Sequence, residues 1–152
     1  MTRDSITYGI LRQLVEEHFD FLLAGGFHFL DERRSNDPVL FVVMIAGKNV
    51  ALRLTYDRRD RVCDIGVGKT QGDPTEPFGL DLGSYLHDYC GYRGGYSDGM
   101  TTAQLKTLAP KVRLARDIRW FAGIIQARAP RIVDDTEDFK SRTPSDGKSR
   151  TP

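Results

Sequence analysis

The first part of the chain has the hydrophobic spacing of an amphipathic helix. Across residues 6–24, apolar side chains recur at intervals of three and four, and they therefore fall on one helical face. Asp4 or Ser5 is placed to cap the start of this helix. Gly25 and Gly26 end it, because glycine readily adopts the left-handed conformation that closes a helix. We therefore predict a single helix over this segment.

The pattern then changes to that of strands. Residues 27–30 are short and aromatic, and residues 39–46 are apolar on both faces, as expected for a central strand. Residues 50–56 alternate between apolar and polar, which is the period of a strand with one buried face. Residues 62–67 form the next apolar segment, after a turn rich in aspartate and arginine. Short connections between these segments predict an antiparallel meander of three or four strands.

The alternation also assigns side chains to the two faces of the predicted sheet. Leu52 and Leu54 fall on the same side and are expected to point into the core. Arg53 and Thr55 fall on the opposite side, which is expected to be exposed.

The second half of the chain reads as helical, with two glycine-rich interruptions. Residues 80–89 form a short candidate helix between two such loops. Residues 101–128 keep helical spacing, but Pro110 lies inside them, so we expect a break there with Pro110 starting the second piece. Residues 132–152 are poor in apolar side chains, and the five-residue sequence Lys-Ser-Arg-Thr-Pro occurs in them twice, at 140–144 and 148–152.

Together these segments predict one α+β domain over residues 3–131, followed by a disordered tail over residues 132–152. The antiparallel sheet is expected to be flanked by the N-terminal helix and the C-terminal helices.

Composition narrows the classes of function. The formal net charge is +1, which is too balanced for a protein held to nucleic acid by charge over its whole surface. The chain has two cysteines, no apolar run long enough to span a membrane and no signal peptide at its start. We therefore expect a cytoplasmic protein without membrane contact. Nothing in the composition predicts its oligomeric state.

Two short motifs suggest chemistry but are incomplete. Residues 66–70 resemble the end of a phosphate-binding loop, yet the position that requires its first glycine holds Cys63. His87 and Cys90 have the spacing of two zinc ligands or of a nucleophile with its base, but this spacing alone is common. We therefore predict no catalytic residue, no metal and no cofactor.

Two segments have the composition of a binding surface. The loop at residues 91–99 mixes tyrosine, arginine and glycine, and the last helix is basic. Tyrosine and arginine dominate the binding energy of many protein interfaces. The candidate binding residues are Tyr92, Arg93 and Tyr96 of the loop and Arg113, Arg116 and Arg119 of the helix. The alternative interpretation is a flexible connector and an ordinary solvated helix face.

The first 70 or so residues also resemble a loose group of known proteins. The resemblance lies in the run at residues 14–22, in Gly26-Phe27, and in the hairpin that ends at residues 54–59. The group comprises small uncharacterised bacterial α+β proteins, some of which are immunity proteins that neutralise the toxins of competing bacteria. The resemblance implies a cytosolic binding protein whose partner is another protein, such as a toxin.

The predicted function is therefore a non-enzymatic protein-binding module of the immunity or adaptor kind. Two alternatives stay open. One is a nucleic-acid binder that uses the basic last helix, and the other is a small enzyme that uses the loop at residues 85–99.

Overall fold

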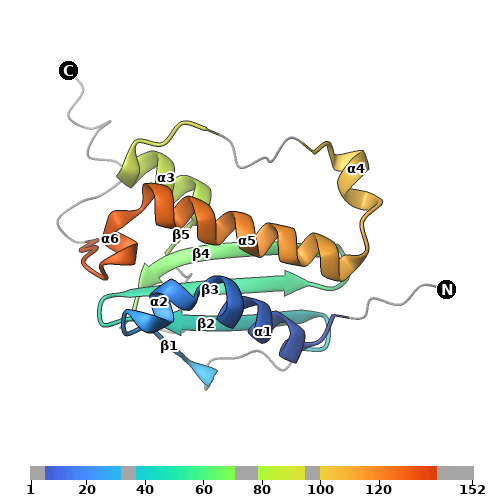
Figure 1. The fold of residues 1–152 in the computed structure, drawn as a ribbon, viewed down its shortest axis with the longest axis horizontal. Helices are drawn as coiled ribbons and strands as arrows, with labels where there is room; N and C mark the ends of the chain where they lie inside the picture. The colour runs from blue at the N-terminus through green and yellow to red at the C-terminus, as the bar shows by residue number, and fades with distance from the viewer. Residues whose placement is uncertain (1–5, 32–36, 71–78, 95–99, 140–152) are drawn as a thin grey trace.

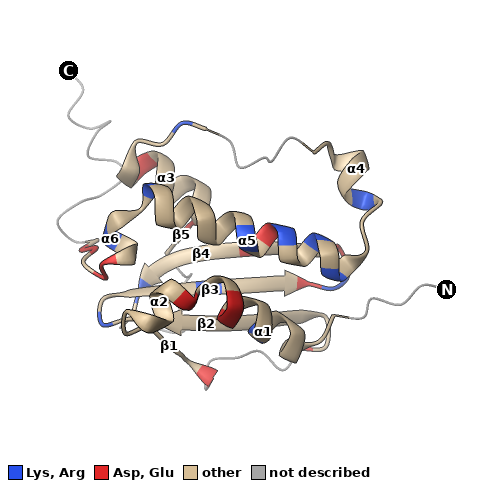
Figure 2. Ribbon diagram, in the orientation of Figure 1, with Lys and Arg blue, Asp and Glu red and all other residues tan. Residues whose placement is uncertain are grey.

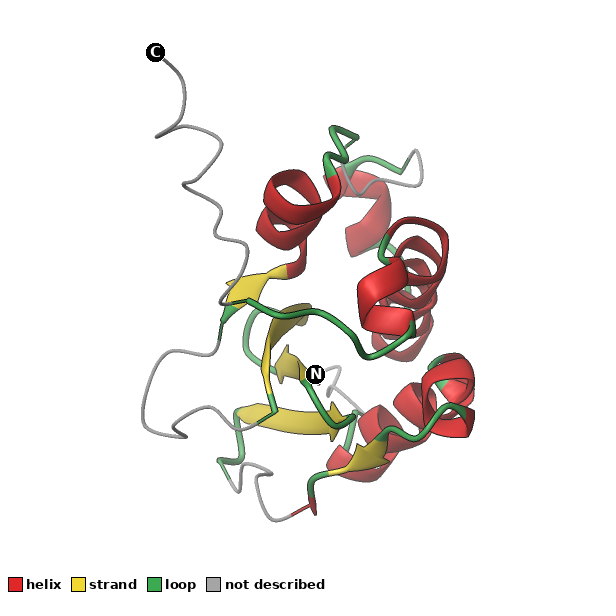
Figure 3. Cartoon of the chain, turned by 90° about the vertical axis from the view of Figure 1, so that its left-hand side faces the viewer, coloured by secondary structure: helices red, strands yellow, loops and turns green. Residues whose placement is uncertain are grey.

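The computed structural model describes residues 6–31, 37–70, 79–94 and 100–139 and shows an α+β fold. One antiparallel sheet has the strand order β1-β2-β3-β4-β5, so each strand pairs with its neighbour in sequence. Figures 1 and 3 show the helices gathered over one side of this sheet. The predicted fold class is confirmed, with five strands where we expected three or four. The strands are β1 (His28–Phe29), β2 (Leu40–Ala46), β3 (Val50–Asp57), β4 (Val62–Lys69) and β5 (Leu80–Asp81).

The helices occur before and after the strands. They are α1 (Tyr8–His18), α2 (Asp20–Ala24), α3 (Leu82–Cys90), α4 (Thr102–Lys106), α5 (Pro110–Arg128) and α6 (Pro130–Val133). In Figure 1, α1 lies over β2 and β3, and α5 runs beside it across the same face of the sheet. The core lies between this helical layer and the sheet.

The alternation predicted for β3 is confirmed. Leu52 and Leu54 are fully buried and belong to the core beneath the helices. Arg53 and Thr55 lie on the opposite face and are half-buried. Because the strands pair in register, this division extends to the neighbouring strands, where Val43 on β2 and Ile65 on β4 join the core.

The first helical segment ends at Ala24 with Gly25 as its cap, as predicted, but it differs from the prediction at its start and in its middle. Thr7, rather than Asp4 or Ser5, caps α1, and its hydroxyl accepts a hydrogen bond from the Ile10 N–H. The helix is interrupted at Phe19, which has φ −104° and ψ 23°. The Phe19 ring is completely buried. The segment therefore forms two helices, α1 and α2, with a buried aromatic residue at their junction.

The third helix begins later than predicted because its first residues belong to the sheet. Leu80 and Asp81 pair with Val67 and Gly66 as strand β5. The Asp81 carboxylate then caps α3 by accepting hydrogen bonds from the Ser84 N–H and hydroxyl.

The predicted break at Pro110 is confirmed. Helix α4 ends before it, and Pro110 is the first residue of α5, where its missing N–H costs no helical hydrogen bond.

The C-terminal segment differs from the predicted tail. Residues 132–139 are packed against the domain, and residues 140–152 lie outside the described residues. The carboxylate of Asp135 accepts hydrogen bonds from the backbone N–H groups of Lys48, Asn49 and Val50 in the β2–β3 turn. The folded domain therefore extends beyond residue 131, because a side chain in the acidic segment satisfies the backbone of a distant turn.

Glu137 anchors the same segment to α3. Its carboxylate is almost fully buried and accepts a hydrogen bond from the Tyr85 hydroxyl at 2.5 Å. The Phe139 ring packs edge-on against Tyr89 at 5.8 Å between centroids. Composition alone had suggested disorder here, but these side chains each find a partner elsewhere in the fold.

The first prediction tests the Asp135 contact. Asp135→Ala should lower the free energy of unfolding by about 1 to 3 kcal/mol, because it leaves backbone N–H groups in the β2–β3 turn without an acceptor. Denaturant unfolding measures this difference. The matched control is Asp134→Ala, which removes an exposed carboxylate one residue earlier and should change stability by less than about 0.5 kcal/mol. Equal effects of the two variants would contradict the proposed contact.

The second prediction tests the buried pair of Tyr85 and Glu137. Tyr85→Phe removes the hydroxyl and leaves a buried carboxylate short of a donor, so it should cost about 1 to 3 kcal/mol. Tyr8→Phe is the control, because the Tyr8 hydroxyl makes an exposed and longer hydrogen bond of 3.4 Å to Asp31. Thermal unfolding of both variants gives the comparison. A loss no larger for Tyr85→Phe than for Tyr8→Phe would show that the C-terminal segment is not anchored as described.

Candidate protein-binding site

Helix α5 has a core-facing side and a half-buried flank beside it. The core-facing side carries apolar residues, all of them buried: Leu114, Ile118, Phe121, Ala122 and Ile125. The flank repeats at intervals of three and four residues along the whole helix, so its members lie in one row. We call this row the α5 stripe, and its members are half-buried except for the exposed Arg128: Arg113, Arg116, Asp117, Trp120, Ile124 and Arg128.

One end of the α5 stripe meets the segment that follows α3. The guanidinium of Arg128 lies over the Tyr92 ring, 5.5 Å from its centroid. Gly91 adopts a positive φ of 69° and ends α3, and the Tyr92 N–H then donates to the Leu86 carbonyl. This turn places the half-buried Tyr92 ring beside the C-terminal end of α5.

Arg93 lies at the same end and is held by a short chain of polar contacts. Its guanidinium is 3.2 Å from Nε2 of His87, and Nδ1 of His87 is 2.9 Å from the Asp88 carboxylate. If Arg93 donates to Nε2, then Nδ1 carries the proton that reaches Asp88, because a neutral imidazole has one donor and one acceptor. His87 thus orients Arg93, and both nitrogens of the His87 ring make polar contacts, one with Arg93 and one with Asp88.

The other end of the stripe combines two arginines with a carboxylate. Arg113, Arg116 and Asp117 are half-buried, and the charge of Asp117 acts on Cys63 near the start of β4. Burial raises the pKa of Asp117 to about 6, although Arg113 and Arg116 act to lower it and Asp64 adds to the rise. Burial also raises the pKa of the neighbouring Cys63 thiol, with Asp117 contributing to that rise. Asp117 therefore binds a proton at higher pH than an ordinary aspartate does.

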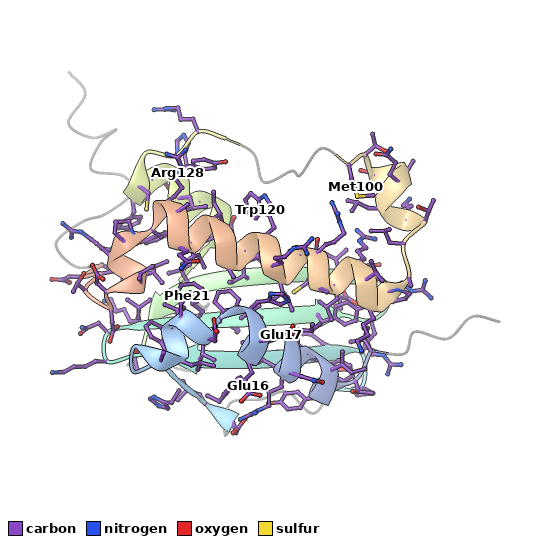
Figure 4. All side chains as sticks on the ribbon, viewed as in Figure 1. Glu16, Glu17, Phe21, Met100, Trp120 and Arg128 are labelled. Carbon is purple, nitrogen blue, oxygen red and sulfur yellow. The ribbon has the colours of Figure 1, made fainter. Side chains whose placement is uncertain are left out.

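Trp120 joins the two ends. Figure 4 shows its side chain rising from the middle of α5, with Arg128 toward one end of the helix and Met100 beside α4 toward the other. The indole is half-buried and packs edge-on against Phe121 at 6.2 Å between ring centroids. Trp120 was not among the residues predicted from the sequence, although its position four residues after Arg116 and eight before Arg128 places it on their flank.

Four of the six sequence-predicted binding residues lie along one flank of α5, in two pairs near its opposite ends, and two do not. Tyr92 and Arg93 lie at the C-terminal end of α5, and Arg113 and Arg116 lie toward its N-terminal end, with Trp120 between them. Arg119 is exposed and lies outside the stripe. Tyr96 lies outside the described residues.

The two incomplete motifs do not form sites in the structure. Gly66 and Lys69 both lie within strand β4, whereas a phosphate-binding loop requires them in a loop that opens a helix. His87 contacts Arg93 and Asp88, as described above. Within the described ranges, no three His, Cys, Asp or Glu side chains are grouped as a metal ion would need.

A second polar surface lies on the sheet face that carries Arg53 and Thr55. Gly66 pairs with Arg53 on one side and Asp81 on the other, so the glycine separates two charged residues. A cavity of about 410 Å³ opens here, and Asp64 and Phe121 also line it. Burial raises the pKa of Asp64, and the nearby charges of Asp81 and Asp57 add to this rise. Asp81 also caps α3, so this surface has a role in the structure of the fold whether or not it binds a ligand.

Comparisons with protein-family models, with curated proteins and with solved structures found no match. Among the described residues, no helix combines the length and the apolar character that a membrane span needs.

The third prediction uses the raised pKa of Asp117. The folded protein binds this proton at higher pH than the unfolded chain, whose aspartate has its ordinary value of 3.8, so stability should fall as pH rises from about 4 through about 6. Asp117→Asn removes the ionised form. It should stabilise the protein by about 1 to 2 kcal/mol at neutral pH, less than the full shift would give because the carboxylate is partly exposed and screened.

Denaturant unfolding across this pH range measures the effect. When the pH is lowered further, to about 3 and below, the two proteins should converge, because Asp117 is then mostly protonated in both the folded and the unfolded state. The exposed Asp134→Asn serves as the control and should show no comparable gain. A variant Asp117→Asn that is less stable than the natural protein at neutral pH would contradict the assignment.

Proposed function

We propose that the chain is a non-enzymatic protein-binding module and that its partner contacts the α5 stripe together with Tyr92 and Arg93. The observation that carries the proposal is the arrangement of these residues. Tyr92, from the segment that follows α3, contacts Arg128 at one end of the α5 stripe. The indole of Trp120 lies in the middle of the helix, between this contact and the arginines near the other end. Tryptophan, tyrosine and arginine are the residues that contribute most to binding at protein interfaces.

The partial burial of the stripe supports the same proposal. Half-buried side chains keep defined conformations and so lose less conformational entropy when a partner orders them. The Arg128–Tyr92 contact and the His87–Arg93 contact both hold a candidate contact residue in place before binding. A surface of this kind is prepared for a partner at a small entropic cost.

The finer identity of the module is also part of the proposal. We infer a cytoplasmic immunity or adaptor protein, and a toxin of a competing bacterium is the partner that the sequence resemblance implies. A toxin gene beside the gene for this chain in its genome would support this identity. Binding of the purified chain to that toxin with loss of toxicity would establish it.

The fourth prediction tests the surface. The natural chain and its variants serve as baits in extracts of the host, and bound proteins are quantified by mass spectrometry. A partner should be enriched by the natural chain and depleted with Trp120→Ala and with Arg116→Ala. With the partner purified, at least one of Trp120→Ala, Arg116→Ala, Tyr92→Ala and Arg93→Ala should weaken binding by about 2 kcal/mol, which is roughly 30-fold in the dissociation constant.

The control for this experiment is Lys48→Ala, which removes an exposed positive charge from the β2–β3 turn, outside the stripe. Melting temperatures show whether each variant is folded, and Arg93→Ala is informative if Trp120→Ala is not, because Arg93 is exposed. A partner that binds all four folded variants as well as the natural chain would place the site elsewhere, with the Arg53 surface as the next candidate. A steep fall of affinity with salt, measured on an oligonucleotide, would favour a nucleic-acid partner.

A further inference from the structure

Helix α5, which forms the proposed surface, carries more basic than acidic residues. The helix carries a single acidic residue, Asp117, and its basic residues are Lys111, Arg113, Arg116, Arg119 and Arg128. Figure 2 shows the positions of Lys and Arg concentrated in the half of α5 that follows Pro110, with an acidic position among them. A partner that buries this end of the stripe must therefore supply negative charge, or it leaves positive charges without compensation.

Arg113 shows how such a partner would be held. Its Nε is shielded from solvent and donates no hydrogen bond to any described group. A buried donor without an acceptor costs free energy, and such donors are rare in folded proteins. Because Nε is shielded, a carboxylate that arrives with the partner would accept from the terminal nitrogens of the guanidinium, in a charge-assisted hydrogen bond. Arg113 is therefore suited to a carboxylate that arrives with the partner.

Asp117 lies where it opposes that carboxylate. It follows Arg113 by one helical turn and adjoins Arg116, so all three share the same end of the stripe. The groups that act on Asp117 come from two elements: Arg113 and Arg116 on α5, and Asp64 and Cys63 on β4. An ionised Asp117 repels an incoming carboxylate and competes with it for the two arginines. A protonated Asp117 does neither.

We propose that the partner presents an acidic segment to Arg113 and Arg116, and that Asp117 makes this contact tighter at mildly acidic pH than at neutral pH. This inference rests on the proposed function, and it adds the chemistry of the partner and a pH response. The raised pKa of Asp117 places its protonation at about 6, which is above the range in which aspartates of the partner titrate. The partner thus keeps its charge while Asp117 loses its own.

The test uses a defined probe and the full chain. The probe is a fluorescent peptide in which aspartates alternate with serines around one central leucine, and its counterpart has lysine in place of each aspartate. Fluorescence anisotropy gives the dissociation constants at low salt between about pH 5.5 and about pH 7.5, on either side of the pKa of Asp117. The acidic peptide should bind about three to ten times more tightly at the lower pH, and the lysine peptide should not bind.

The variants separate Asp117 from other causes of pH dependence. Asp117→Asn should bind the acidic peptide tightly at both pH values, with the pH response removed. Arg113→Gln with Arg116→Gln should weaken binding at least tenfold at both pH values, whereas Lys48→Gln should leave it unchanged. A merely structural role of Asp117 would alter melting temperature but would not remove the pH response selectively.

Each of the remaining outcomes would contradict either the inference or the proposed function, and the experiments distinguish the two cases. No binding of the acidic peptide, or a pH response that persists in Asp117→Asn, overturns the inference. If a partner from the host still depends on Trp120 in that case, the proposed function stands without it. If the peptide behaves as expected but no stripe variant affects the partner from the host, the proposed function fails while the acidic-ligand chemistry of this end of α5 holds.

Discussion

The hydrogen bonds accepted by Asp135 connect the C-terminal part of the chain to the sheet. A hairpin turn exposes backbone N–H groups that strand pairing does not use, and each needs an acceptor if it is to be shielded from water. Asp135 supplies acceptors to three consecutive N–H groups, and its own backbone adopts a positive φ of 56° to reach them. Gly47 permits this approach, because a side chain there would collide with the carboxylate. Since α5 and α6 lead directly into this contact, it holds the end of the long helix against the β2–β3 turn.

The position of α5 in turn decides which of its side chains can serve a partner. Its core-facing side is filled by contacts with the sheet, and its most exposed side is solvated. The flank between them holds the α5 stripe, where the charged and aromatic side chains are half-buried except for the exposed Arg128. Burial raises the pKa of Asp117 there, so the ionised carboxylate costs stability at neutral pH. A cost of this kind is typical of functional positions, which are not optimised for stability alone.

The parts of the fold that follow from local patterns were predictable. The alternation in β3 and the apolar run of β2 identified central strands, and Pro110 marked the start of α5. What could not be predicted depends on distant partners. Asp135 meets Asn49 from 86 residues away, and Glu137 meets Tyr85 from 52 residues away, so a local reading of their composition suggested a solvated tail. The fifth strand was missed for a related reason, because two residues carry too little pattern to be recognised as a strand.

The candidate site was predictable at its ends but not at its centre. Charge and aromatic composition identified Tyr92, Arg93, Arg113 and Arg116, because these residue types are common at interfaces. A single tryptophan within helical apolar spacing is more often part of a core, so the sequence did not identify Trp120 as a candidate binding residue. Its place on the α5 stripe becomes clear only when the flank of α5 is distinguished from the core-facing side.

We propose the α5 stripe rather than the Arg53 cavity as the binding surface for a reason that concerns the fold itself. On the sheet, Asp81 both lines the cavity and caps α3, so a change in its chemistry would also weaken a helix that carries Tyr85. On α5, neither Arg113 nor Trp120 caps a helix, and the C-terminal end of the helix is held by Asp135 and Glu137 through the segment that follows α6. The contacts that hold α5 in place are thus separate from the side chains that its flank presents. Such a separation lets contact residues vary in charge and shape while the helix keeps its position.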